Sequence, residues 1–369
     1  MSAYIHKLAT AVPATACRQA DLASWMQYYM GEDAATRRFI DRTWPLAGVE
    51  RRHTVLPDFE GGSAEPLFFP AGGGTEQPGT EARNQLYEEH AGALCTRVAR
   101  SLLDGQPPTQ AQRISHVITV SCTGFTAPGP EQAVIRALGL SRSTRRYHLG
   151  FMGCYAALPA LDLARSICEA EPSARVLVLS VELCTLHLQP DPGRDNLVSA
   201  ALFADGAAGA LVCAEEPVRP GFRIEATASL LTEEASSEMA WTLGDTGFRM
   251  TLSKEVPAII EANLHAALQP LLTQLGEGPE AVDAWALHPG GRPILDGIER
   301  SLDLRPEHTE VSRRILANYG NMSSASILFV LAAMLDRGAG LPERRILALA
   351  CGPGLAVESM RLTGVGGRR

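Results

Sequence analysis

Short runs of apolar residues alternate along the chain with longer segments in which apolar residues recur every three or four positions. The short runs predict strands over residues 116–122, 176–183, 202–213, 284–287 and 345–351. The longer segments predict helices over residues 155–170, 255–275, 292–302 and 324–335. The longest of these helices places Ile260, Leu264 and Leu268 on one face, as in a helix packed on a sheet. This alternation is typical of an α/β protein whose sheets are buried on both faces.

Two segments interrupt this alternation. Residues 57–80 hold six glycines and four prolines, which preclude a regular element, so we expect a long surface loop there. A polar connection that contains proline, over residues 215–221, separates a first half, residues 1–217, from a second half, residues 218–369. The length of the chain allows two such halves.

The charge balance limits the partners of the chain. Its 369 residues include 33 Lys and Arg against 41 Asp and Glu, a net charge of −8. Nucleic-acid-binding proteins normally present a basic surface to the phosphates, so we expect no nucleic-acid partner. An anionic ligand would have to meet a local basic patch on this acidic chain.

The distribution of apolar residues and cysteines predicts a cytoplasmic protein. Residues 1–12 lack the basic start and apolar core of a secretory signal, and no apolar run reaches the roughly 18 residues that span a bilayer. We therefore expect no membrane partner and reduced thiols. The eight cysteines form no C-x-x-C pair and no zinc-finger spacing with histidine, so we expect no metal site and treat a cysteine by default as a small buried hydrophobe.

One cysteine stands apart because glycines precede it and a helix follows it. Gly150 and Gly153 come just before Cys154, and the Ala- and Leu-rich residues 155–170 place this cysteine at the first turn of the predicted helix. Free N–H groups and the positive end of the helix dipole favour a thiolate, and can lower a thiol pKa from about 8.5 to about 3.5–7.5. A packing cysteine at a strand–helix junction fits this segment equally well.

A histidine and an asparagine lie at two further junctions. His288 follows the apolar strand 284–287 and precedes Pro289-Gly290-Gly291, so we expect its imidazole at the strand end where α/β proteins bind ligands. Asn321 and several small residues precede the apolar helix 324–335. Each residue alone is more typical of a buried polar group or a helix cap. Three such residues at junctions indicate catalysis instead.

On these residues the chain resembles the type III polyketide synthases, the chalcone-synthase-like branch of the thiolase superfamily, over nearly its whole length. The family's nucleophile, histidine and asparagine motifs match at Gly153-Cys154, residues 288–291 and residues 320–324. Further matches are residues 201–208, Gly247-Phe248 and residues 352–354. The resemblance implies a thiolase-like, five-layered αβαβα fold from two related halves, a homodimer, and a tunnel that delivers coenzyme A thioesters to the cysteine.

The resemblance also implies the chemistry, which is that of an acyltransferase. Cys154 takes an acyl group from an acyl-CoA starter, with His288 as its imidazolium partner. His288 and Asn321 then donate hydrogen bonds to the thioester oxygen of malonyl-CoA while carbon dioxide leaves, as an oxyanion hole does. The resulting enolate attacks the Cys154 thioester. No metal or redox cofactor is expected, and the substrates are coenzyme A thioesters.

Other matched positions are implied to shape the substrate path. The two gating aromatic residues are Phe203 and Phe248. The positions implied to line the cavity are Cys122, Thr123, Ala127, His187, Ser323, Gly352, Pro353 and Gly354. The basic tunnel mouth for the coenzyme A phosphates is implied at Arg51 and Arg52.

Two departures from the plant pattern bear on the starter. His187 replaces a smaller side chain and is expected to reshape the elongation cavity, while the small Ala127 is expected to leave space for a long acyl tail. We therefore favour a resemblance to bacterial enzymes that accept fatty acyl starters and make alkylpyrones or alkylresorcinols. Aromatic starters and malonyl-only synthesis stay open.

Three alternatives share parts of this pattern. A ketoacyl synthase III-like enzyme uses the same trio for a single condensation, but the loop 352–354, Phe203 and Phe248 argue against it. A papain-like protease also has Cys, His and Asn in this chain order, but its signature around the cysteine is absent. A noncatalytic binding protein of the thiolase fold is disfavoured by the intact trio.

Overall fold

The computed structural model describes residues 2–30, 34–59, 68, 77–232 and 237–366. Its strands are β1 (Ala3–Ala11), β2 (Thr15–Arg18), β3 (Arg51–Thr54), β4 (His116–Ser121), β5 (Arg145–Gly150), β6 (Arg175–Leu183), β7 (Asp205–Cys213), β8 (Gly221–Leu231), β9 (Met239–Gly244), β10 (Gly247–Leu252), β11 (Ala284–Leu287), β12 (Arg345–Gly352) and β13 (Ala356–Val365). Its α-helices are α1 (Gln19–Met30), α2 (Ala34–Thr43), α3 (Thr80–Leu103), α4 (Pro108–Ala111), α5 (Pro130–Leu138), α6 (Ala157–Ala170), α7 (Arg194–Leu202), α8 (Val256–Leu275), α9 (Arg292–Ser301), α10 (Pro306–Tyr319) and α11 (Ala325–Met334).

The strand order shows that the chain contains the same unit twice. The large sheet runs β11-β12-β13-β8-β1-β7-β6-β4-β5. The two parts of the sheet follow the same plan outward from its centre, in the orders β1-β7-β6-β4 and β8-β13-β12-β11. In each part the first three strands pair antiparallel and the last two pair parallel. Helix α3 corresponds to α8 and helix α6 to α11 in chain order. The two related halves expected from the resemblance are therefore present.

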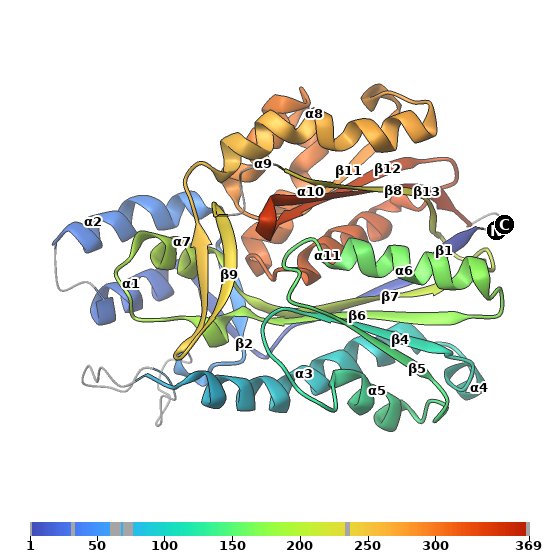
Figure 1. Ribbon diagram of the computed structural model, residues 1–369, viewed down its shortest axis with the longest axis horizontal. Coiled ribbons are helices and arrows are strands. Elements are labelled where there is room, and N and C mark those ends of the chain that lie inside the picture. The colour runs from blue at the N-terminus through green and yellow to red at the C-terminus, as the bar shows by residue number, and fades with distance from the viewer. Residues whose placement is uncertain (1, 31–33, 60–67, 69–76, 233–236, 367–369) are drawn as a thin grey trace.

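The layers follow from this repeat. Figure 1 shows α6 and α11 between the two parts of the sheet, α3 and α5 outside one part, and α8 and α9 outside the other. A buried cluster that includes Leu161 of α6 and Leu328 of α11 joins the inner faces of both parts. The parts meet where β1 pairs with β8. This αβαβα arrangement confirms the predicted fold class.

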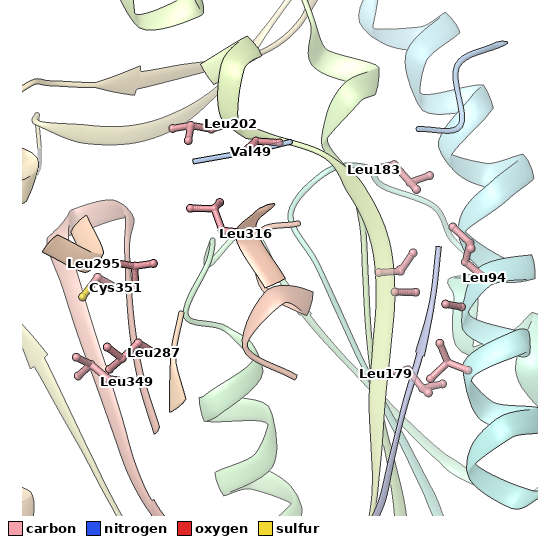
Figure 2. Close-up of a cluster of buried hydrophobic side chains, with 14 of the residues drawn as sticks. Val49, Leu94, Leu179, Leu183, Leu202, Leu287, Leu295, Leu316, Leu349 and Cys351 are labelled. Atoms are coloured by element: carbon pink, nitrogen blue, oxygen red, sulfur yellow. The ribbon is translucent and has the colours of Figure 1, made fainter. Parts of the chain in front are cut away.

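A second buried cluster packs the outer helices onto the sheet. In Figure 2, Leu94 and Leu179 lie in one part of this cluster and Leu287 and Leu349 in another, with Leu316 between them. Burying one such side chain contributes about 1.5–3 kcal/mol to folding. The apolar core thus continues from one half of the chain to the other.

Most predicted elements lie within two residues of their observed bounds, with one clear exception. The run 202–213 was expected to be a strand, but Leu202 ends α7 and β7 begins at Asp205. A buried helix end and a buried strand are both continuously apolar, so the pattern does not separate them. In the predicted loop 57–80, residues 60–67 and 69–76 lie outside the described residues.

Three further features concern membrane-spanning helices, cysteines and clusters of metal-binding side chains. No helix within the described ranges is long and apolar enough to cross a membrane. All eight cysteines are free and buried. In the described part of the chain, no three His, Cys, Asp or Glu side chains gather closely enough to hold a metal ion.

Candidate active site

The structural repeat brings the predicted catalytic residues together. Cys154 lies just before α6 and Asn321 just before the corresponding helix α11, so both occupy the N-terminal ends of the two middle-layer helices. His288 directly follows β11, as Cys122 follows the corresponding strand β4. Residues far apart in the sequence thus meet because the same strand–helix junctions face each other across the middle layer.

Cys154 lies in a turn that precedes α6, not in the first helical turn as expected, because the helix begins only at Ala157. The backbone of this turn requires glycine before the cysteine. Gly153 has a φ of +93°, and a Cβ there would lie 2.5 Å from Pro353 Cδ. Gly352 is equally crowded, since its Cβ would lie 2.7 Å from Tyr155. The loop 352–354 therefore packs against the turn that holds Cys154.

The Cys154 thiol has polar neighbours and a buried setting. Its side chain is hydrogen-bonded to Ser323 and Asn321, and both contacts favour the thiolate. Burial is the larger effect and raises the pKa of Cys154 to about 12. Burial likewise lowers the pKa of His288 to about 3. Burial thus disfavours the charged form of each group, and the thiolate–imidazolium pair stays a prediction.

The asparagine side chain ties two segments to each other. Asn321 Oδ1 accepts a hydrogen bond from Ser323 N at 2.9 Å, and Nδ2 donates one to Gly290 O at 3.2 Å. The other hydrogen of Nδ2 serves the contact with Cys154, since only a donor favours the thiolate. The amide is therefore held in a fixed orientation between the N-terminal end of α11 and the loop after His288.

His288 is a buried polar residue that lacks a protein partner. Its exposed fraction is 4%, and neither ring nitrogen has a hydrogen-bond partner among the described residues. Its backbone is fixed, because His288 N donates to Leu349 O at 2.8 Å. Nearly all buried polar groups in proteins are hydrogen-bonded, so an unpartnered buried imidazole indicates a group that meets a ligand.

A buried glutamate next to Cys122, Glu182, was not predicted from the sequence. Glu182 Oε2 accepts hydrogen bonds from Cys122 N at 3.0 Å and Thr123 Oγ1 at 2.9 Å, and Oε1 accepts one from Ser324 Oγ. Burial raises the pKa of Glu182 to about 6. The one available signal was a glutamate inside the otherwise apolar run 176–183, because an ionisable residue in a buried strand needs dedicated partners.

A cavity of about 590 Å³ is lined by Phe203 and Phe248, the two predicted gating residues, and by His187. Trp241 of β9 also lines this cavity, and its Nε1 donates to Cys122 O at 2.7 Å. No local sequence signal pointed to this tryptophan. Cys122 Sγ and Ser323 Oγ lie 3.3 Å apart, and neither residue is among those that line this cavity.

One implied substrate contact, that of Arg52, is wrong for this chain, while those of Ala127 and Arg51 stay predictions. Ala127 is exposed and is not among the residues that line the 590 Å³ cavity or two others of about 630 and 440 Å³. Arg52 is 1% exposed, and its guanidinium donates to three backbone carbonyls and to Gln19. It cannot line a tunnel mouth. Arg51 is exposed but lies beside none of these cavities.

A duplicated αβαβα fold with this trio at its middle layer is that of the thiolase-like condensing enzymes. Family models described as chalcone and stilbene synthases, N-terminal domain and C-terminal domain, match residues 2–217 and 224–366. The chain therefore belongs to the chalcone and stilbene synthase family and is a type III polyketide synthase, an acyltransferase that uses acyl-CoA and malonyl-CoA substrates. The ketoacyl synthase III alternative is not favoured by these matches.

Relatives and solved structures agree with this family. A 1,3,6,8-tetrahydroxynaphthalene synthase of Streptomyces griseus is 33% identical over 84% of this chain and 79% of its own. An α-pyrone synthesis polyketide synthase-like protein of Mycobacterium tuberculosis is 30% identical over 97% of this chain and 90% of its own. The crystal structure of PKS-I from the brown alga Ectocarpus siliculosus is similar with a TM-score of 0.88 at 28% identity, over 99% of this chain and 98% of that one.

Proposed function

We propose that Cys154, His288 and Asn321 carry the reaction of this polyketide synthase. The Cys154 thiolate attacks the carbonyl of the acyl-CoA starter, the bond to the coenzyme A sulfur breaks, and the thiol proton passes through His288 to the leaving thiolate. Malonyl-CoA then loses carbon dioxide, and the enolate oxygen receives hydrogen bonds from His288 and Asn321. A carbon–carbon bond forms as the enolate attacks the acyl group and the bond to Cys154 Sγ breaks. The unpartnered imidazole carries this proposal, because it supplies a hydrogen bond that the protein itself does not use.

Variants of the trio test this assignment. Cys154→Ala is expected to abolish acyl loading, measured as the mass increase of the intact protein, whereas Cys213→Ala in β7 is a matched buried-cysteine control that should load normally. His288→Gln and Asn321→Ala should still load starter but release carbon dioxide from malonyl-CoA about 10²–10³-fold more slowly, as after loss of an oxyanion donor. Normal acylation of the Cys154→Ala protein, or undiminished carbon dioxide release by both other variants, would refute the assignment.

We propose that no metal or redox cofactor takes part. Decarboxylation itself supplies the carbanion, and the remaining steps are acyl transfers between thiols. A cytoplasmic location fits this chemistry, because the nucleophile has to remain a reduced thiol. Activity that survives a chelator such as EDTA at full rate is the expected result.

We propose that coenzyme A enters beside α2 and α7, not at Arg51 and Arg52. A mainly apolar cavity of about 630 Å³ reaches from Gly290, two residues after His288, to Arg194 at the start of α7. A neighbouring hollow is lined by Arg38, Arg42 and the same Arg194. Arginine forks suit phosphate oxygens, so this hollow is the local basic patch that the acidic chain requires.

Charge reversal tests this entrance. Arg42→Glu is expected to raise the KM for malonyl-CoA about tenfold while kcat changes little, because phosphate contacts bind ground state and transition state alike. Arg51→Glu is the matched control, an exposed arginine beside none of the three cavities, and should leave the KM unchanged. An equal effect of both variants would indicate long-range charge alone and remove the assignment.

We propose a fatty acyl starter and an alkylpyrone or alkylresorcinol product. This proposal no longer rests on Ala127. It rests on the mycobacterial relative described as acting in α-pyrone synthesis. Incubating malonyl-CoA with acyl-CoAs of graded length and identifying products by mass tests it. Preferred use of short or aromatic starters, or of malonyl-CoA alone, would remove the proposal.

We propose that two copies of the chain associate through β5. This strand ends the large sheet, pairs only with β4 among the described strands, and exposes most of its residues. Phe125, Tyr147 and Phe151, at or beside this edge, are 48%, 42% and 37% exposed. An exposed strand edge flanked by aromatic rings suits a two-fold contact with a second β5.

A further inference from the structure

His187 makes two hydrogen bonds that fix its protonation state. Its Nδ1 accepts from Phe248 N at 3.1 Å, and its Nε2 lies 2.8 Å from Thr123 O. A backbone N–H can only donate and a carbonyl can only accept, so Nδ1 carries the lone pair and Nε2 carries the proton. The ring is therefore neutral and has no site left for acid–base work. It joins the segment after β4 to the first residues of β10.

The same ring also stacks on the gating residue. The His187 and Phe248 ring centroids are 4.0 Å apart, with an angle of 12° between the ring planes. Trp241 meets both rings edge-on, at 5.3 Å from His187 and 5.7 Å from Phe248. Gly247 permits this approach, because a Cβ there would lie 3.3 Å from His187 Nδ1. Phe248 is thus held by its backbone and by its ring.

We infer that His187 is a positioning residue that fixes Phe248 at the gate and so commits each enolate to carbon–carbon bond formation. The inference deepens the proposed function and rests on it. After carbon dioxide leaves, the enolate of acetyl-CoA has two fates: it attacks the acyl group on Cys154, or it takes a proton from water and departs as acetyl-CoA. A gating ring that cannot turn aside keeps water from the enolate and favours the first fate.

The burial of His187 supports a static role. The residue is 7% exposed, and burial lowers the pKa of its imidazole to about 3. The neighbouring Arg83 guanidinium acts in the same direction, because a nearby cation disfavours an imidazolium. His187 therefore acts through the position of Phe248 and not through a proton.

The ratio of acetyl-CoA released to malonyl units incorporated measures this commitment. In His187→Ala, the loss of the two hydrogen bonds and of the ring stack should raise the ratio at least about fivefold. His187→Phe keeps an aromatic ring of similar size but leaves Phe248 N and Thr123 O without their hydrogen-bond partner. Its ratio should therefore lie between those of wild type and His187→Ala. Starter loading on Cys154, read by intact mass, should be normal in both variants.

Leu188→Ala is the matched control. Leu188 lines the same cavity, so this change adds space without removing a hydrogen bond from Phe248. Longer products with a wild-type ratio are expected. A raised ratio in Leu188→Ala equal to that in His187→Ala, or a wild-type ratio in both His187 variants, would overturn the inference. Failure of the wild-type protein to load starter or release carbon dioxide would instead remove the proposed function, so the two failures are distinguishable.

Discussion

Replacing Arg52 by methionine tests whether this buried arginine stabilises the C-terminal end of α7 instead of binding coenzyme A. Arg52 Nη1 donates to Ala200 O at 2.6 Å and Phe203 O at 2.7 Å, and Nη2 donates to Ala201 O at 2.6 Å and to Gln19. These carbonyls belong to the last turn of α7 and to the residue after it, which is the gating Phe203. Arg52 is thus a buried cation at the negative end of a helix dipole.

The size of the effect follows from these contacts. Burial lowers the pKa of Arg52 to about 10, so the guanidinium is still charged at neutral pH and its hydrogen bonds stay charge-assisted. Such a hydrogen bond contributes about 1.5–3 kcal/mol to the free energy of unfolding, and a buried carbonyl left without a partner costs about 1–3 kcal/mol. The three carbonyls share one helix end and can relax together, and methionine carries no desolvation cost. We therefore expect a loss of about 3–5 kcal/mol in the free energy of unfolding, as when one partner of a buried charged contact is removed.

Urea unfolding, followed by far-UV circular dichroism, gives this free energy for wild type, Arg52→Met and Arg51→Met. The exposed neighbour Arg51 is the control, and its variant should stay within about 0.5 kcal/mol of wild type. In folded Arg52→Met protein, the KM for malonyl-CoA should not rise as it does when a phosphate contact is lost. Wild-type stability together with a tenfold higher KM would refute the structural role and restore Arg52 to the tunnel mouth.

Three further changes test other parts of the structure. Gly153→Ala forces a Cβ into Pro353, so it should lower the free energy of unfolding by about 1–3 kcal/mol. The control Gly105→Ala also lies at positive φ but in open space, and should lower this free energy by only about 1 kcal/mol. Equal thermal shifts of the two variants would contradict this expectation. Glu182 has its pKa raised to about 6, so its protonated form stabilises the fold below about pH 4.5, and this contribution is lost as pH rises through 6. Relative to Glu182→Gln, wild type should thus lose about 2 kcal/mol between pH 4.5 and 7, and parallel urea-unfolding profiles would rule this out. Phe125→Glu should convert the β5-mediated dimer into monomer in sedimentation velocity, and an unchanged sedimentation coefficient would argue against that interface.

Local patterns predicted the elements and the trio because both leave short-range signals. A helix packed on a sheet repeats its apolar residues in register with its turn, and catalytic junctions carry glycines and small residues next to a reactive side chain. Cys154, His288 and Asn321 could therefore be selected from three separate segments. Their meeting could not be derived from any one segment, because it depends on the structural repeat that sets α6 beside α11.

The amino-acid sequence alone predicted five of the strands, four of the helices, the family resemblance and the three candidate catalytic residues. Only the tertiary structure decided what surrounds each side chain. Arg51 and Arg52 are identical neighbours in the sequence, yet one is in solvent and the other is buried against a helix end. Glu182 and His187 acquire their partners from the segment after β4, from β10 and from the residue before α11, all distant in the chain. Burial, hydrogen bonding and pKa are properties of those assembled surroundings, and packing across the sheet fixes them only when the chain is folded.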